Sequence, residues 1–409
     1  MVTDLKGEIA AARVGGRRFA WRDGLVVAQV AVTALLLVCA GLLLRSTSAA
    51  EQANVGFRPE GLAIVGFDLA MAGYDEARAP QFFAEAERRL AAMPGVTGVA
   101  RASRLPFSLN FNTSNIAVPG HQQTPEETGR PIDSAIVSPG YFETIGIPLV
   151  QGRAFAESDT PDRPRVAVIN ETMARQFWPE GNALGQLVYE LSLSSGRAIE
   201  IVGVVADHRI RTVGEPALPA LYMSTTQRPS SYGVLVARTA GDERALLDEM
   251  RRTLLAMEPD VLFMDNQTMR EQMSAMLFPV KAAATLVAAF GAVGLLLAAI
   301  GLYGVIAFSV ARRTREIGIR MAIGARPASV LTLVLRQGAG IAGVGLLVGG
   351  VLAAAATQVV AGALYGVGVA DPVAWGGAAA ALLAIALVAN LIPARRAMRI
   401  DPIRALRAD

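Results

Sequence analysis

Few residues of this chain have the types and spacing that catalysis requires. The two histidines, His121 and His208, are far apart and neither has a second histidine at helical spacing, so the usual zinc ligand sets are missing. The sequence contains no G-x-S-x-G motif and no lysine at S-x-x-K spacing. We expect the most suggestive cluster, Asp207, His208 and Arg209, to be a polar strand end in a solvated loop. The sequence therefore predicts no catalytic residues and no metal site, and a protein that is not an enzyme.

The sequence also lacks the P-loop motif that nucleotide hydrolysis commonly requires. A P-loop needs G-x-x-x-x-G-K-[ST], in which the lysine neutralises phosphate charge and backbone N–H groups hold the phosphates. The chain has two lysines, Lys6 and Lys281, and neither lies in such a loop. We expect no cofactor in this chain, so a partner subunit must bind ATP if the protein performs driven work.

The residues best suited to receive force from a partner lie between positions 311 and 329. In helical register Glu316 and Arg320 form an i, i+4 pair, and Ile319 and Ile323 fall on one face. A basic flank that stops membrane transfer would explain the arginines, but not the ordered Ile, Gly and Glu among them. We therefore predict a surface that docks on an ATPase, formed by Arg315, Glu316, Gly318, Ile319, Arg320, Ile323 and Gly324.

The segments on both sides of this loop are long and apolar. The chain is 53% hydrophobic and only 18% charged, with a mean hydropathy of +0.40, which is too apolar for an ordinary soluble protein of this size. A bilayer span needs about 20 residues. We predict transmembrane helices at 24–45, 281–310, 330–361 and 373–393, with connecting segments at 46–280, 311–329 and 362–372 and tails at 1–23 and 394–409. The first run is too long for a signal peptide and ends in Arg45 without a small-residue cleavage site, so we expect an uncleaved anchor.

The distribution of charge predicts the orientation of these helices. Residues 46–280 contain 20 Arg, no Lys and 28 acidic residues, whereas the rest of the chain contains 18 basic and 7 acidic residues. Cytoplasmic loops retain Lys and Arg, while long domains cross the membrane largely regardless of charge. Both termini and the 311–329 loop should therefore be cytoplasmic, with the 46–280 domain outside. Because the positive charge is confined to membrane flanks, we do not expect a nucleic-acid partner; membrane lipid is the expected surrounding.

Small residues recur at close-packing spacing in the predicted spans. Such faces let helix backbones approach one another, since lipid offers no hydrophobic drive for helix association. No span has a charged residue near its midplane, as a transporter driven by protons or sodium would need. We expect external, ATP-supplied drive and predict helix packing at Gly301, Gly304, Ala339, Gly343, Gly345 and Gly349.

The 46–280 domain should mix helices and strands. A strand–helix–strand order at 61–69, 76–93 and 96–102 returns at 232–238, 242–257 and 261–264. One composite domain folded from both ends of the insert is therefore expected, with a smaller inserted subdomain at about 110–197. The strand 199–205 is expected to return the chain to the first subdomain.

Four motifs together resemble one family. They are REIGIRMAIGA at 315–325, PARRAMRIDPIRALR at 393–407, NETMARQFWP at 170–179 and IVGVVADHR at 201–209. The chain resembles the FtsX-like permease domain and periplasmic region of MacB-type ABC transporters. The resemblance implies an α-helical membrane protein with four transmembrane helices and a large periplasmic α+β domain between the first two, made of a porter-like part and an inserted subdomain. It also implies that Glu316, Gly318, Arg320 and Gly324 belong to the surface docking on the ATPase.

The resemblance further implies partners and a mechanism. Members pair with a second permease unit and with cytoplasmic ATPase domains, and they convert nucleotide-driven closure into motion of the periplasmic domain, called mechanotransmission. The run at 24–45 also resembles the first span of the second half of duplicated permeases, so the second unit is either an identical copy or a homologous half.

These observations lead to one main expectation and two alternatives. We expect the permease subunit of an ABC-type export complex in a bacterial inner membrane, with a periplasmic membrane-fusion protein as a further candidate partner. One alternative is a transmembrane regulator that activates a periplasmic cell-wall hydrolase without transport, and the other is a ligand-sensing membrane protein. An adjacent gene for a membrane-fusion protein would favour export, and an adjacent hydrolase gene would favour regulation.

Overall fold

The computed structural model describes residues 21–75, 77–108, 110, 112–120, 130–191, 197–314, 316, 317, 319, 323, 327–361 and 364–398. The chain divides into two compact units, Gln52–Phe278 and the residues on either side of it. We call the first the α+β domain and the second the helical domain. The fold class predicted from the sequence, four membrane-length helices and a large α+β domain between the first two, is confirmed.

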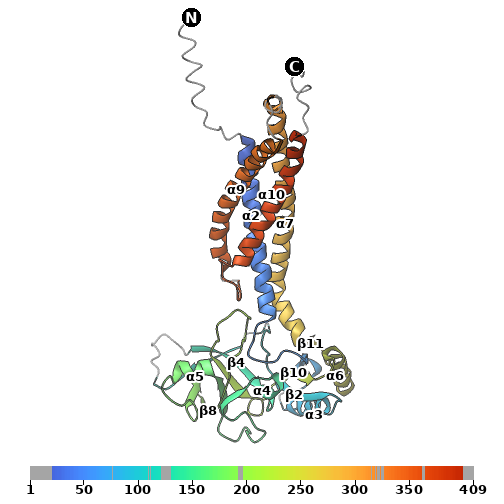
Figure 1. The fold of residues 1–409 in the computed structure, drawn as a ribbon. Coiled ribbons are helices and arrows are strands. Elements are labelled where there is room, and N and C mark those ends of the chain that lie inside the picture. Colours follow the sequence, from blue (N-terminus) through green and yellow to red (C-terminus); the bar gives the residue numbers. More distant parts are fainter. Residues whose placement is uncertain are drawn as a thin grey trace. The chain divides into compact units, whose positions relative to one another are not determined.

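Four long helices dominate the helical domain: α2 (Trp21–Glu51), α7 (Met269–Arg312), α9 (Pro327–Val360) and α10 (Pro372–Met398) (Figure 1). Each is long and apolar enough to cross a membrane. Helix α10 begins where Asp371 accepts hydrogen bonds from the backbone N–H groups of Val373 and Ala374, with Pro372 at its first position. The core of the domain is formed by small and aliphatic side chains of all four helices.

Helix α7 begins much earlier than the position 281 expected from hydropathy. Its start is a capping box, because the Thr268 N–H donates to Glu271 Oε2 (3.0 Å) and the Glu271 N–H donates to Thr268 Oγ1 (3.3 Å). The first turns contain polar residues that belong to the α+β domain, so they lie outside the apolar run. Helix α2 likewise extends to Glu51, past the expected end at position 45.

The described part of the α+β domain contains one 11-stranded sheet, in the order β11-β1-β10-β2-β4-β3-β7-β8-β6-β9, with β5 paired to β8. Its first lobe is built from both ends of the insert, as the sequence indicated. Helices α3 and α6 cover one face of this lobe, and stacked Phe67 and Phe83 lie in its core with ring centroids 5.3 Å apart. The lobe comprises β1 (Leu62–Asp68), the 3₁₀ turn η1 (Leu69–Ala72), α3 (Ala79–Ala91), β2 (Val96–Ala102), β10 (Tyr232–Thr239), α6 (Glu243–Met257) and β11 (Phe263–Thr268).

The second, inserted lobe extends further than expected. The prediction that residues 199–205 return to the first lobe is wrong, because β8 pairs with β5, β6 and β7. Ile199 and Ile201 are buried in the core of the inserted lobe beside Ile116 and Ile169. The insert lasts through β9, which pairs with β4 and β6. Its elements are β3 (Thr113–Ala117), β4 (Arg130–Val137), α4 (Tyr141–Ile145), β5 (Leu149–Gly152), β6 (Val166–Asn170), α5 (Glu171–Phe177), β7 (Leu187–Glu190), β8 (Arg197–Val205) and β9 (Ala220–Ser224).

Candidate functional site

The predicted docking surface is described in part. Glu316, Ile319 and Ile323 are exposed, with 41% of Ile319 and 81% of Ile323 accessible. The Ile323 N–H donates to the Ile319 carbonyl (3.1 Å), so these two side chains are one helical turn apart. Two accessible isoleucines one turn apart form an apolar face that a soluble partner could cover. The other four predicted members, Arg315, Gly318, Arg320 and Gly324, lie outside the described residues.

Arginines from three helices gather at the end of the helical domain that carries this loop. The guanidinium groups of Arg22 and Arg312 lie over the Phe308 ring, 4.6 and 5.7 Å from its centroid. Arg396 Nη1 donates to the Tyr303 hydroxyl (3.2 Å). The aromatic faces let these cations stay at the end of an apolar bundle.

Three of the six predicted packing residues make close helix contacts in this chain. A Cβ at Gly345 would lie 2.7 Å from Val30 Cβ, and one at Gly349 would lie 2.6 Å from the Ala31 carbonyl oxygen. A Cβ at Gly301 would lie 2.9 Å from Gln29 Oε1. All three glycines therefore face α2, where a larger residue could not fit without movement.

The other three predicted packing residues face no neighbour in the described chain. A Cβ at Gly304 or Gly343 would meet no heavy atom within 4 Å, and Ala339 is exposed. Sequence reasoning also missed Gly338, where a Cβ would lie 2.1 Å from Nδ2 of the buried Asn390. A polar residue inside a span, such as Asn390, is the sequence signal that could have found this contact.

The buried side chains of the helical domain are not ionisable. Among the described residues, its buried polar groups are Thr33, Ser46, Thr47, Thr357 and Asn390. Between α7 and α9, Ser309 Oγ donates to Gln337 Oε1 (3.2 Å). The hydroxyls of Thr33, Thr47 and Thr357 donate to carbonyls of their own helices, and none of these neutral groups can carry a proton or bind a cation by charge.

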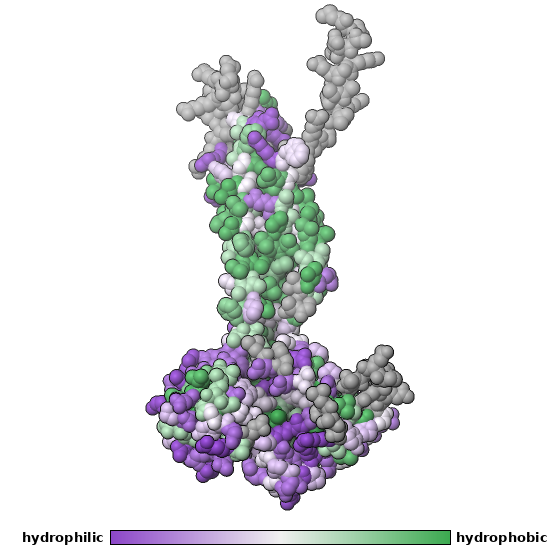
Figure 2. Space-filling view, turned by 180° about the vertical axis from the view of Figure 1, so that it is seen from behind, coloured by the Kyte–Doolittle hydropathy of each residue, from purple (hydrophilic) through white to green (hydrophobic). Residues whose placement is uncertain are grey.

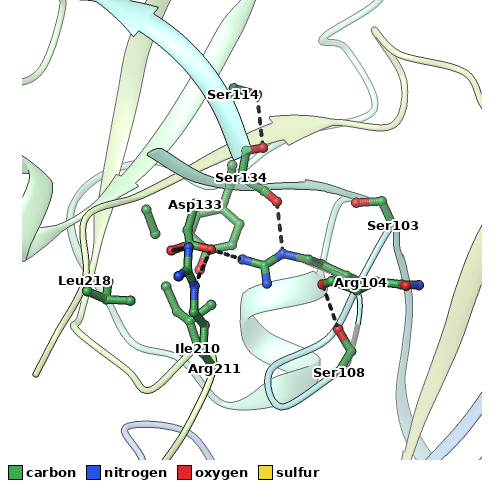
Figure 3. Close-up of polar contacts among 12 residues, drawn as sticks. Ser103, Arg104, Ser108, Ser114, Asp133, Ser134, Ile210, Arg211 and Leu218 are labelled. Atoms are coloured by element: carbon green, nitrogen blue, oxygen red, sulfur yellow. Dashed lines mark hydrogen bonds and ion pairs between the residues drawn. The ribbon is translucent and has the colours of Figure 1, made fainter. Parts of the chain in front are cut away.

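The α+β domain, in contrast, buries a charged cluster (Figure 3). Asp133 lies between Arg104 and Arg211, with Asp133 and Arg104 each at most 5% exposed. Arg104 Nη2 and Arg211 Nε donate to Asp133 Oδ1 at 3.1 and 3.2 Å, and Arg104 Nε donates to the Ser134 carbonyl at 3.0 Å. Because β4 carries Asp133 and β2 leads into Arg104, the cluster joins the first lobe to the inserted lobe.

A second network surrounds Asp207, one of the three residues flagged by sequence. The Asp207 carboxylate accepts hydrogen bonds from the Thr172 N–H and hydroxyl, both at 2.8 Å, from Asn170 Nδ2 at 2.9 Å, and from Arg175 at 2.6 Å. Asn170 also caps α5 by accepting from the Met173 N–H (3.1 Å). Asp207 therefore holds the start of α5 and is not free to act as a base.

His208 is buried, contrary to the expectation of a solvated loop. It is 3% exposed, and the hydroxyl of Tyr222 on β9 lies 2.6 Å from His208 Nε2. Burial lowers the pKa of His208 to about 4, so the imidazole is neutral near pH 7. With Nδ1 3.2 Å from the Ala206 carbonyl, Nδ1 carries the proton and Nε2 accepts from Tyr222. The role of this histidine is structural.

A further buried pair lies in a cavity of about 770 Å³ between α3 and the β9 region. Glu87 Oε1 and Arg101 Nε are 3.6 Å apart, and Arg101 stacks on Phe83 with its guanidinium 4.3 Å from the ring centroid. Burial raises the pKa of Glu87 to about 7 despite the nearby arginine. Among the described residues, no group of three or more His, Cys, Asp or Glu side chains could hold a metal ion.

Comparisons with known proteins cover most of the chain. Residues 24–253 match the model of the MacB-like periplasmic core domain, and residues 288–402 match that of the FtsX-like permease C-terminal domain. The uncharacterized ABC transporter permease YknZ of Bacillus subtilis is 27% identical over 69% of this chain and 71% of its own length. The macrolide export ATP-binding/permease protein MacB of Mannheimia succiniciproducens is 26% identical over 65% of this chain. The pyoverdine export ATP-binding/permease protein PvdT of Pseudomonas entomophila is 28% identical over 64%.

The chain spans only 42% of that MacB and 41% of that PvdT. Among solved structures, the periplasmic region of MacB from Actinobacillus actinomycetemcomitans aligns with a TM-score of 0.36 at 14% identity, over 53% of this chain and 94% of that one. The extracellular domain of YknZ aligns with a TM-score of 0.34 at 16% identity, over 50% and 100%. Because the first family model alone covers more than half of the sequence, this multi-pass membrane protein belongs to the family of FtsX-like permeases with a MacB-like periplasmic core domain.

Proposed function

We propose that this chain is the permease subunit of an ABC-type export complex, in which ATP hydrolysis by a separate cytoplasmic ATPase moves the α+β domain. Family membership supports the permease role, and the names of the MacB and PvdT relatives support export. Those relatives combine ATP-binding and permease parts, whereas these 409 residues contain no P-loop. The proposal therefore assigns ATP hydrolysis to a partner of this chain.

The observation that carries the proposal is that helix α7 belongs to both domains. Its first turns are fixed in the α+β domain, where Met269 is fully buried and Gln272 Nε2 donates to the Pro106 carbonyl (2.6 Å). The same helix, 44 residues long in all, runs through the membrane-length segment to Arg312 beside the docking loop. A push on the loop would reach the α+β domain along a single helix.

The character of the helical core supports an external source of energy. A permease that is driven by an ion gradient needs a titratable or cation-binding group in its membrane core. The buried polar side chains in the described part of the helical core are all neutral. A stroke delivered by nucleotide hydrolysis in a partner has no such requirement.

We further propose that the arginine-rich end of the helical domain lies in the cytoplasm of a bacterial cell. The α+β domain then lies on the periplasmic side of the inner membrane. The support is the gathering of Arg22, Arg312 and Arg396 at one end, which follows the positive-inside rule. A second permease unit and a periplasmic membrane-fusion protein complete the proposed complex.

Orientation can be tested by cysteine labelling, since Cys39 is the single cysteine of the sequence. In a Cys39→Ala background, a membrane-impermeant maleimide should label Leu262→Cys in intact spheroplasts and label Ile323→Cys only after lysis. Both positions are exposed in the structure, so in cells that express this chain without the proposed ATPase, access to reagent is decided by the side of the membrane. Labelling of Ile323→Cys in intact spheroplasts would contradict the proposal.

Docking can be tested by co-expression and co-purification of this chain with a candidate ABC ATPase. The variants Glu316→Lys, Ile323→Asp and Arg320→Glu should lower recovery of the ATPase and its activity in the complex. Glu180→Lys, an exposed charge reversal in the α+β domain, is the matched control and should leave both unchanged. Equal recovery with all four variants would show that the loop is not the docking surface.

A further inference from the structure

We propose that a cavity of about 430 Å³ in the α+β domain binds an amphiphilic organic cation. The cavity lies among the ends of β10 and β11 and the first turns of α7. The residues that line it include Phe107, Tyr232, Met264, Asp265, Gln272 and Met276. Its volume falls in the range of sites for drug-sized ligands, about 300–1,000 Å³. Neither the family matches nor the names of the relatives assign a ligand to these residues.

A β-bulge aims the carboxylate into this cavity. In the β1–β11 pairing, Gly66 lies opposite Asp265 and Phe67 lies opposite Phe263, so Met264 is the extra residue. Phe263 consequently packs against the core under α3 and α6, while Asp265 and Gln267 line the cavity. Gly66 leaves space for the acid, since a Cβ there would lie 2.6 Å from Asp265 Oδ2.

The Asp265 carboxylate has no counter-ion in the part of the chain that the structure describes. No described group donates a hydrogen bond to it, and burial alone raises its pKa from the ordinary value. None of the described side chains that line the cavity is basic. A half-buried carboxylate in these surroundings favours a cationic ligand, because the ligand would supply the missing opposite charge.

The remaining walls suit an apolar body attached to that cation. Phe107 is 1% exposed and has a φ of 62°, a conformation held by the bond from its N–H to the Ile210 carbonyl (2.8 Å) and by the bond from Gln272 to Pro106. Met264 is 63% exposed, and thioether side chains adapt to varied apolar shapes. The Tyr232 ring adds a face on which an ammonium group can lie.

One wall of the cavity is the start of α7, which links the site to the proposed stroke. Gln272, Ala275 and Met276 line the cavity, and Pro279 lies inside the same helix. Because proline has no N–H, the Ala275 carbonyl lacks the helical hydrogen bond that residue 279 would otherwise donate. Binding against these turns bears on the helix that enters the helical domain; a role for the ligand as cargo rests on the proposed function, whereas binding itself does not.

Two sources could supply an ammonium group on an apolar body: an aminophospholipid or a free amphiphile. The test uses the full chain, without ATPase, in nanodiscs of phosphatidylglycerol, and a benzophenone-bearing alkyltrimethylammonium probe. Photolabelling should map to peptides containing Met264 or Met276. Adding phosphatidylethanolamine to the discs should lower labelling if the lipid is the natural occupant and leave it unchanged if a free amphiphile is; either result supports the cation site.

Matched variants decide the role of the carboxylate. Asp265→Asn keeps the shape and removes the charge, and should weaken probe binding about ten- to a hundred-fold. Asp248→Asn, an exposed acid on α6, should leave binding unchanged. A benzophenone probe with a carboxylate or a neutral hydroxyl in place of the ammonium should label poorly. Labelling that is equal for the three probes, unaffected by Asp265→Asn, or confined to other peptides would overturn the proposal.

The photolabelling assay contains no ATPase. A negative result would therefore contradict the ligand site and leave the proposed permease role intact. Conversely, loss of ATPase docking would leave the photolabelling result unchanged. Thermal unfolding of Asp265→Asn beside Asp248→Asn shows whether both fold, and Met264→Ala offers a second variant that lowers labelling without touching the charge.

Discussion

The two domains of this permease are held together by different means. The α+β domain buries aromatic rings and the charged Asp133 cluster, and it holds the start of α5 through the half-buried Asp207 network. The helical domain buries small and aliphatic residues, and two of its close contacts occur where Gly345 and Gly349 meet α2. Figure 2 shows the matching difference at the surface, with hydrophobic side chains over the helices and hydrophilic ones over the α+β domain.

This difference assigns each domain a mechanical character. A buried ion pair has few favourable geometries, because a displacement leaves a buried charge unpaired. Close helix packing through glycines depends on non-directional contacts, which change more gradually as helices slide. Under the proposed function, we infer that the α+β domain would move as a lever of fixed shape, while the helical domain would accommodate the stroke.

The largest effect is expected from breaking the charged cluster. Asp133→Ala should lower the free energy of unfolding of the α+β domain by about 3–5 kcal/mol, because it leaves Arg104 buried without an anion. The change in the free energy of unfolding can be measured by chemical denaturation, with limited proteolysis as the probe of unfolding. Asp248→Ala is the exposed control, and the double variant Asp133→Leu with Arg104→Met should recover most of the loss. If Asp133→Ala were as stable as Asp248→Ala, the cluster would not define the lever.

Acid should weaken the same domain through His208. Its pKa is about 4 when folded, against an ordinary value of about 6.5, so the unfolded chain binds more protons between these values. The free energy of unfolding should therefore fall as pH drops from about 6.5 to about 4, by an amount on the order of 3 kcal/mol.

Glu87 opposes this trend. Burial raises the pKa of Glu87 from 4.5 to about 7 in the folded state. Between these two pH values the folded chain binds more protons at Glu87 than the unfolded chain does. The contribution of Glu87 to the free energy of unfolding therefore rises as the pH falls through this interval. Glu87→Gln should consequently lose more stability between pH 7 and pH 5 than the wild type, as measured by denaturation at the two pH values. An unchanged pH dependence in this variant would show that Glu87 is ionised in the folded domain.

The next effect in size concerns the helical domain. Gly349→Leu should lower its unfolding free energy by about 1–3 kcal/mol, because the new side chain meets backbone and side-chain atoms of α2. Gly340→Leu is the matched control on the same helix, since a Cβ there meets no heavy atom within 4 Å. Unfolding in mixed micelles with increasing dodecyl sulfate compares them. Equal stability of the two variants would mean that α9 can retreat from α2 at no cost.

Local sequence signals predicted the elements better than their partners. The apolar runs and the repeated strand–helix–strand order were sufficient for four spans and a domain folded from both ends. Hydropathy does not predict the start of α7, because its first turns are polar, although Thr268 and Glu271 have the spacing of a capping box. The neighbours of β8 are not predicted, because its Ile and Val side chains indicate a strand but do not specify which strands it pairs with.

Long-range pairs carried no local signal at all. Arg104 and Arg211 are 29 and 78 residues from Asp133 in the sequence, and neither spacing has meaning until the strands are placed. Small-residue spacing has the same limit, since Gly345 and Gly349 face α2 while Ala339 and Gly343, equally spaced on the same helix, face no described neighbour. Spacing identifies a face of a helix, and only the tertiary arrangement decides what covers it.

The smallest expected effect therefore separates covered from uncovered glycines on α9. In an isolated chain Gly343→Ala should raise helix stability by up to about 1 kcal/mol, because alanine restricts the unfolded backbone and its methyl group meets no atom. Gly345→Ala should do the opposite, since its methyl group would lie 2.7 Å from Val30 Cβ. Unfolding in mixed micelles measures both. If Gly343→Ala instead lowers stability, or reduces recovery of a dimer in cross-linking, then Gly343 is covered in the assembly, and the second permease unit is the partner that the open glycine face of α9 accommodates.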